Sequence, residues 1–284
     1  MIQSNNKVYQ RIMQMKKLII NADDFGYSVE TNEAIKFGYQ NKVITSTSII
    51  TNLEGFEHAI NEILPQIPQI DIGIHLNIIE GKSLTESSLL CNSNGYFKNN
   101  YVQILLKSKD KNFLSDVEKE FRAQIEKAQQ YCKISHIDSH VHTHSIPAIF
   151  DLTTKLAKEY NIKFIRTQNE IPYIVFDKLF CPQFYINIIK NLLLNILSFQ
   201  NKKKLKNTNN YFIGVLYTGM MNKKTILNGL KKIKKDNSIT EVIFHPSFNK
   251  QKINNFKELQ IVQNPNFEKE IQNLGFTLSC YSDI

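Results

Sequence analysis

Residues 136–144 read HIDSHVHTH and carry a side chain that could bind metal or transfer a proton at every second position. In an extended chain, side chains two residues apart project from the same face. A strand here would therefore gather four imidazoles and the carboxylate of Asp138 on one face. The imidazoles belong to His136, His140, His142 and His144. Core packing requires no such face, so the spacing predicts a divalent metal site. A polar edge strand or a chance histidine tract is the alternative interpretation.

Two further histidines follow apolar runs typical of strands, His75 in GIHL and His245 in VIFHP. Asp23 and Asp24 come after another such run, LIINA. Two adjacent carboxylates point in different directions, so one can bind a metal while the other faces an attacking water. An aspartate pair in a turn or helix cap is equally common. The pair therefore points to chemistry only in combination with the histidines.

Mixed imidazole and carboxylate ligation suits borderline divalent cations, and three protein ligands leave positions open for water and substrate. Such a metal lowers the pKa of its water and polarises a carbonyl, so hydrolysis is the natural reaction class. Phosphoesterases tend to use two metals with bridging carboxylates. Carboxylates are few among these segments, which favours a hydrolase with one metal over a two-metal phosphoesterase.

The elements that would position these residues alternate between apolar strand-like runs and helical patterns. Strands are predicted at 17–23, 43–50, 70–76, 136–144, 162–166, 212–216 and 241–244, with a last one ending near 281. Helices are predicted at 31–41, 56–64, 115–131, 151–160 and 223–234, the third from a capping-box spacing at Ser115. Repeated βα units without a glycine-rich dinucleotide motif predict an α/β fold, a single-domain distorted (β/α) barrel with about seven strands. The candidate residues then meet at the carboxyl-terminal rim, where barrels build their active sites.

Length and composition agree with one domain, because 284 residues with 42% hydrophobic content can bury a large core. We expect this domain over residues 17–284, with 1–16 as a flexible N-terminal extension. An insertion near 171–210 contains an amphipathic helix. Its most apolar stretch, 184–199, is interrupted by polar residues and is too short to span a bilayer, so the helix belongs to the globular body or faces a partner.

The net charge of +9 comes from lysine clusters without interleaved aromatic residues, which favours a solvated face over a nucleic-acid groove. The four cysteines are far apart and form no C-x-x-C motif, which is typical of reduced cysteines in a cytoplasmic protein. We therefore expect neither a nucleic acid nor a membrane as partner.

Five segments together resemble a known family, the YdjC-like carbohydrate deacetylases, which include chitooligosaccharide deacetylases. The segments are NADDFGYS at 21–28, VITSTS at 43–48, GIHL at 73–76, HIDSHVHTH at 136–144 and EVIFHP at 241–246. The resemblance follows the family's order from about Lys17 to the end of the chain.

The resemblance implies a distorted (β/α) barrel that removes acetyl groups from N-acetylated sugars or oligosaccharides, by attack of a metal-bound water on the acetamide carbonyl. It implies one divalent metal ion, most often magnesium in the family, with zinc or another transition metal as alternatives. The implied metal ligands are Asp24, His75 and His140. Asp23 would be the general base and His245 the proton donor to the departing amine.

The remaining polar residues are candidates for supporting or substrate-binding roles. Asp138 could orient a metal-binding imidazole through a hydrogen bond. His136, His142 and His144 could support the rim or face the substrate. Arg166 could orient Asp23 or a substrate oxygen, although an exposed ion pair explains it nearly as well. The Tyr217-Thr218-Gly219 segment could line the sugar groove.

Two other functions stay open at this stage. One is another single-metal amidohydrolase on the same scaffold, and the other is a non-catalytic carbohydrate-binding barrel. If the chain is a carbohydrate deacetylase, its expected partner is the N-acetylated sugar. A homodimer is a further hypothesis.

Overall fold

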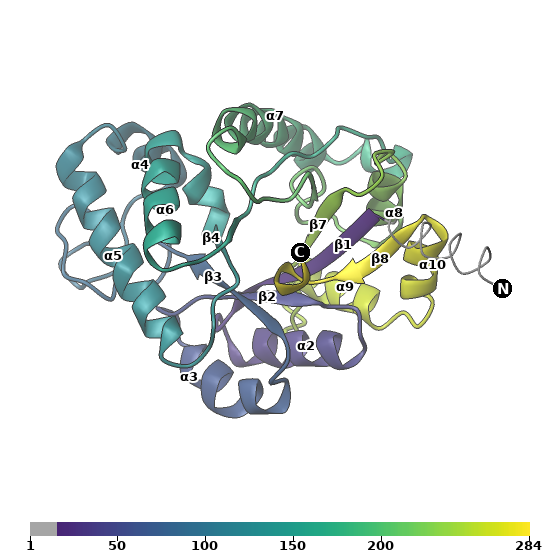
Figure 1. Cartoon of the computed structure of the whole chain (residues 1–284), viewed down its shortest axis with the longest axis horizontal. Helices are drawn as coiled ribbons and strands as arrows, with labels where there is room; N and C mark the ends of the chain where they lie inside the picture. Colours follow the sequence, from purple (N-terminus) through teal and green to yellow (C-terminus); the bar gives the residue numbers. More distant parts are fainter. Residues whose placement is uncertain (1–15) are drawn as a thin grey trace, which may run out of the picture.

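In the computed structural model, which describes residues 16–284, eight strands form one parallel sheet that curls into a distorted barrel (Figure 1). The predicted fold class is therefore confirmed. The strands are β1 (Lys16–Phe25), β2 (Ser46–Ile49), β3 (Asp71–Leu76), β4 (His136–Ser139), β5 (Phe164–Ile165), β6 (Tyr211–Ile213), β7 (Ile239–Phe244) and β8 (Phe276–Ser279). The predicted extension at 1–16 lies outside the described residues, except for Lys16, which begins β1.

Helices surround the sheet (Figure 1). They are α2 (Val29–Gln40), α3 (Phe56–His58), α4 (Tyr101–Lys107), α5 (Lys111–Gln129), α6 (Pro147–Glu159), α7 (Pro182–Lys202), α8 (Lys223–Leu230), α9 (Ile253–Val262) and α10 (Phe267–Asn273). The capping-box prediction for α5 was wrong, because Asp110 caps the helix and Ser115 lies inside it. None of the helices in residues 16–284 is long and apolar enough to cross a membrane.

The strand order is β5-β4-β3-β2-β1-β7-β6, and β8 pairs with β1. β1 is the central strand because it has three neighbours. It pairs with β7 along one edge, and along the other edge with β8 over its first half and β2 over its second half. This arrangement places the end of β1, which carries the two aspartates, beside the ends of β2 and β7.

Alternation along β1 separates an apolar outer face from a mixed inner one. Leu18, Ile20 and Ala22 join the large apolar core between sheet and helices. Ile19 instead packs with Phe164 and Tyr281 in a small separate cluster. Beyond this small cluster, the same face of β1 carries the polar side chains of Asn21 and Asp23. The barrel interior is thus partly apolar and partly polar.

The edge strands β5 and β6 close the barrel through side chains rather than a regular ladder. The amide oxygen of Asn209 accepts from Thr167 N at 2.8 Å, and its nitrogen donates to the carbonyls of Thr167 and Tyr211 at 2.7 and 3.0 Å. One backbone bond, from Phe212 N to Asn169 O at 2.9 Å, crosses the same gap. Asn209 therefore replaces the missing strand pairing.

Candidate metal and catalytic site

The histidine-rich segment does not form one long strand. β4 ends at Ser139, and His140–Ser145 form a 3-10 turn in which Val141 and His142 adopt φ values of 53° and 56°. The predicted common face for all four imidazoles was therefore wrong. Only His136 and Asp138 share a strand face, while the turn directs the other three rings to different places.

Asp24, His75 and His140 nevertheless converge, as the predicted ligand set requires. Their candidate ligand atoms all lie within 4.8 Å of one another. Oδ1 of Asp24 is 3.3 Å from Nε2 of His75 and 3.1 Å from Nδ1 of His140. Asp24 reaches this position with φ 69°, at the irregular end of β1. Three strand ends distant in sequence thus supply one compact group at the carboxyl-terminal rim.

Asp138 orients His75. Its Oδ1 lies 2.7 Å from Nδ1 of His75, and its Oδ2 accepts from Ser48 Oγ at 2.5 Å. With Nδ1 of His75 bonded to Asp138, Nε2 faces Asp24 and is the ring atom that would bind a metal. This is the carboxylate–imidazole arrangement that usually supports a metal-binding histidine.

The electrostatics of the group favour a bound cation. Burial by itself would raise the pKa of Asp24, but His140 and His75 hold this pKa well below its usual value. Burial would also lower the pKa values of the histidines, yet Asp138 raises that of His75 to about 10 and Asp24 raises that of His140 to about 8. The carboxylates thus stabilise positive charge between these side chains. One carboxylate and two imidazoles suit a divalent metal in charge and in donor chemistry.

Arg166 lies beneath this group and is fully buried. Its guanidinium donates to both oxygens of Asp23 at 2.8 and 2.6 Å and to Glu241 at 2.8 Å, and it lies 2.6 Å from Asp138. The interpretation as an exposed ion pair was wrong. A bidentate pair also fixes the plane of the Asp23 carboxylate.

His245 follows β7 at the same rim. Its Nε2 is 3.9 Å from Oδ2 of Asp23, and its Nδ1 is 3.6 Å from Glu258, which also accepts from the backbone N of His245 at 2.6 Å. Burial lowers the pKa of His245, but the carboxylates of Glu258, Asp23 and Asp24, with Glu258 first, together raise the pKa to about 9. The ring is therefore protonated at neutral pH and can donate a proton.

The other three histidines separate into two kinds. His136 is fully buried, stacks on Tyr281 at 3.9 Å and contacts Ser48 Oγ at 3.1 Å. His144 is equally buried and contacts Ser139 Oγ and the carbonyl of Arg166. Burial lowers the pKa of each to about 4, so both are neutral side chains that support the barrel. Neither lines the cavity above the site, whereas His142 does.

A cavity of about 480 Å³ opens above Asp23, Asp24, His75 and His140. The rest of its lining is mostly apolar. It comprises Tyr101, Val102, Ser139, Val141, His142, Lys190, Leu193, Leu194, Val215, Thr218, Ile243 and His245. Of the Tyr217-Thr218-Gly219 segment, only Thr218 lines this cavity, because Tyr217 is buried and bonded to Tyr173 O and Val175 N.

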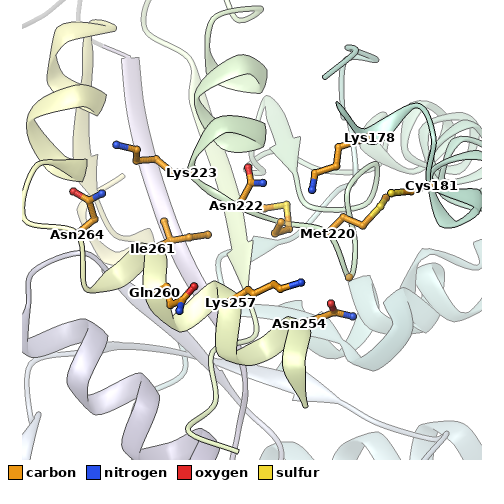
Figure 2. Close-up of a pocket in the computed structure, with 12 residues that line it drawn as sticks. Lys178, Cys181, Met220, Asn222, Lys223, Asn254, Lys257, Gln260, Ile261 and Asn264 are labelled. Atoms are coloured by element: carbon orange, nitrogen blue, oxygen red, sulfur yellow. The ribbon is translucent and has the colours of Figure 1, made fainter. Parts of the chain in front are cut away.

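A second cavity, of about 540 Å³, lies beside α8 and α9 (Figure 2). Lysines and amide side chains surround it, including Lys178, Asn222, Lys257 and Asn264. Gly219 of the Tyr217-Thr218-Gly219 segment lines it, but none of the predicted metal ligands or acid–base residues does. We therefore assign the chemistry to the first cavity.

Sequence reasoning gave no role to four side chains that complete the site. Ser48 and Glu241 belong to the buried network, Glu258 supports His245, and Glu80 lies 3.3 Å from Nε2 of His140. The sequence does contain a pattern that indicates this buried polar network. Asn21 and Asp23 occupy alternate positions within the apolar strand β1, and β2 carries three consecutive buried polar residues, Ser46, Thr47 and Ser48. The spacing in β1 indicates a polar inner barrel face.

Comparison with known proteins identifies the class. The family model of YdjC-like proteins matches residues 17–273, and the chain belongs to this family. It is 36% identical over 149 residues to a carbohydrate deacetylase of Clostridium beijerinckii, a match that covers 51% of this chain and 58% of that protein. It is 31% identical over 193 residues to a carbohydrate deacetylase of Oceanobacillus iheyensis, covering 66% of this chain and 81% of the relative.

The aligned part of the chain thus spans less than two thirds of the length of the Clostridium relative. Among solved structures, a protein of Enterococcus faecalis described as a cellobiose-phosphate cleavage protein superposes with a TM-score of 0.72 over 95% of this chain and 98% of its own. Its sequence identity is 22%, so this likeness concerns the fold.

Proposed function

We propose that this protein is a metal-dependent hydrolase that removes acetyl groups from N-acetylated sugars. The observation that carries the proposal is the convergence of Asp24, His75 and His140 at the floor of one cavity that also receives Asp23 and His245. The family supports the substrate class, since curated relatives are named carbohydrate deacetylases.

In this mechanism Asp24, His75 and His140 hold one divalent ion, and magnesium, zinc or another transition metal is compatible with the donor set. Such an ion lowers the pKa of water and polarises the acetamide carbonyl. Asp138 keeps His75 in the required tautomer. His142 and the apolar wall surround the acetamido group and exclude bulk water.

Asp23 and His245 divide the proton transfers. Asp23 accepts the proton of the attacking water, and Arg166 holds its carboxylate in the required orientation without touching the substrate. His245, protonated at neutral pH, donates to the departing sugar amine. An amine is a poor leaving group, so this donation is needed for the bond to break at a useful rate.

The first test is a deacetylation assay. Protein supplied with magnesium or zinc is incubated with N-acetylglucosamine oligomers, and released acetate and the loss of one acetyl mass are measured. We expect Asp24→Asn and His140→Ala to lose activity about 100-fold or more, because each removes a ligand of the activating ion. Asp151→Asn and His58→Ala, which change the same residue types away from the cavity, serve as controls. Full activity in both site variants would refute the assignment.

The native metal, the length of the sugar, a cytoplasmic location and a homodimer remain predictions. Measuring the number of metal ions bound per chain separates this proposal, which requires one, from a two-metal phosphoesterase. A panel of other acylated amines separates it from a different amidohydrolase.

A further inference from the structure

Helix α7 turns its apolar face to solvent. Ile189, Leu192 and Phe199 are 71%, 61% and 69% exposed. The full apolar face of α7 consists of Tyr185, Ile186, Ile188, Ile189, Leu192, Leu193, Ile196 and Phe199. The helix lies at the periphery of the molecule, at the top of Figure 1. Contiguous apolar surface of this kind usually marks an interaction site.

The opposite face of α7, which also buries Phe184, Leu194 and Leu197, is attached to the barrel by asparagine side chains. Asn187 donates to Thr218 O at 2.9 Å, Asn191 donates to Glu170 at 3.0 Å, and Asn195 bonds to the backbone of Glu170. Asparagines at every fourth position thus form a stripe of hydrogen bonds with the protein. Rotating the helix to bury its apolar face would break all of them, so the orientation is determined by the fold.

The apolar face is continuous with the mouth of the catalytic cavity. Leu193 belongs to both, since it lines the cavity and is 39% exposed. Val102 and Val141 also line the cavity and are 61% and 51% exposed. The metal-binding group lies at the floor, while the entrance is apolar. An apolar entrance suits a substrate that carries apolar groups beside its sugar.

The charge that α7 itself carries has one sign. Between Pro182 and Lys202 the helix contains no aspartate or glutamate and two lysines, Lys190 and Lys202. Three more lysines follow its end, at 203, 204 and 206, and of these Lys204 pairs with Asp151. A second copy would bring an equally positive surface against this one. An anionic bilayer satisfies both the apolar face and the positive charge.

We propose that α7 lies in the surface of an anionic lipid bilayer, with its apolar face among the acyl chains and the neighbouring lysines at the headgroups. This surface binding differs from crossing a membrane, which requires about twenty consecutive, predominantly apolar residues. It replaces our expectation of no membrane partner. Where the proposed deacetylation holds, the cavity then takes an N-acetylated sugar that forms the headgroup of a lipid.

Vesicle flotation tests the docking without reference to activity. The full chain is mixed with vesicles of phosphatidylcholine alone or with phosphatidylglycerol, and the floated fraction is measured. We expect binding to the anionic vesicles and a loss of roughly tenfold or more at high salt. We expect a similar loss in the double variant Ile189→Gln, Leu192→Gln, because two inserted side chains become polar. Val29→Gln with Leu89→Gln, which alters exposed apolar residues away from α7, should bind as the parent does.

Absence of flotation, or equal loss in both double variants, would overturn the docking proposal. A dimer in light scattering that Ile189→Gln, Leu192→Gln converts to monomer, together with no vesicle binding, would show that a second copy covers the face instead.

The inferred lipid-linked substrate is tested with the same vesicles carrying an N-acetylglucosaminyl lipid. We expect its deacetylation to exceed that of free N-acetylglucosamine oligomers at least tenfold, and Ile189→Gln, Leu192→Gln to remove this advantage without changing the rate on the free sugar. Flotation without any deacetylation would refute the proposed function and leave the docking intact. Deacetylation of the free sugar without flotation would refute the docking and leave the proposed function intact.

Discussion

At the scale of single residues, Arg166 determines how the acidic groups of the site coexist. Three buried carboxylates, those of Asp23, Asp138 and Glu241, surround its guanidinium. Arg166 opposes the effect of burial on Asp138 and helps to hold the pKa of this carboxyl well below its usual value, whereas burial still raises the pKa of Glu241 to about 7. Arg166 also fixes the plane of the Asp23 carboxylate through two hydrogen bonds.

Replacing this arginine tests that role. Arg166→Met should lower the free energy of unfolding by about 3–5 kcal/mol, because it leaves buried carboxylates unpaired. Arg122, which pairs with Glu118 and Glu159 at the surface, is the matched control, and Arg122→Met should cost about 1 kcal/mol or less. Urea unfolding measures both. Equal effects of the two substitutions would contradict the network.

The proton donor can be tested through pH. His245 has its pKa raised to about 9, so its protonated form is present below that pH and is lost above it. We expect kcat/KM to fall as pH rises through about 9. Glu258→Gln removes a negative charge beside His245. The pH at which kcat/KM falls should therefore move toward neutrality by about one unit. Glu118→Gln should leave the profile unchanged. An unshifted limb in Glu258→Gln would exclude His245 as the donor.

At the scale of elements, sequence patterns found most strands and helices but not their faces or all their ends. The apolar runs of β1 and β3 were clear, whereas the histidine segment leaves its strand after Ser139 because the chain turns there through two left-handed residues. The helix in the 171–210 insertion was predicted as amphipathic. That its polar side faces the protein followed only from where Glu170 and Thr218 lie.

Breaking the hydrogen bonds between α7 and the barrel should lower the free energy of unfolding. Glu170 is buried, and burial raises its pKa to about 7 although three backbone N–H groups and Asn191 favour the charged form. Asn191→Ala removes one of these donors and should lower the free energy of unfolding by about 1–3 kcal/mol. Asn228→Ala, on the exposed side of α8, should change it by about 0.5 kcal/mol or less. Similar values in thermal or urea unfolding would argue against the asparagine stripe.

At the scale of the whole molecule, closure of the barrel brings the rim residues together. β5 and β6 are short and share no ladder, so the Asn209 side chain connects them. Arg166 directly follows β5, and its backbone N donates to Ile137 O at 3.0 Å. The position of Arg166 over Asp23 therefore depends on this closure.

Removing the connection should loosen this side of the barrel. Asn209→Ala should lower the free energy of unfolding by about 1–3 kcal/mol, since it leaves buried backbone groups of Thr167 unpaired. Hydrogen exchange should become faster at the amides of Arg166 and Phe212, while the β1 amides stay protected. Unchanged exchange at β5 and β6 would show that the closure rests on other contacts.

The sequence by itself determined the alternation of strands and helices, the family and the list of metal-binding and acid–base candidates. These follow from residue type and local spacing, which act over a few positions. The tertiary structure decided which candidates meet. It joined Asp24, His75 and His140, set His136 and His144 aside as supports, and turned α7 outward, because those outcomes depend on contacts between residues far apart in the chain.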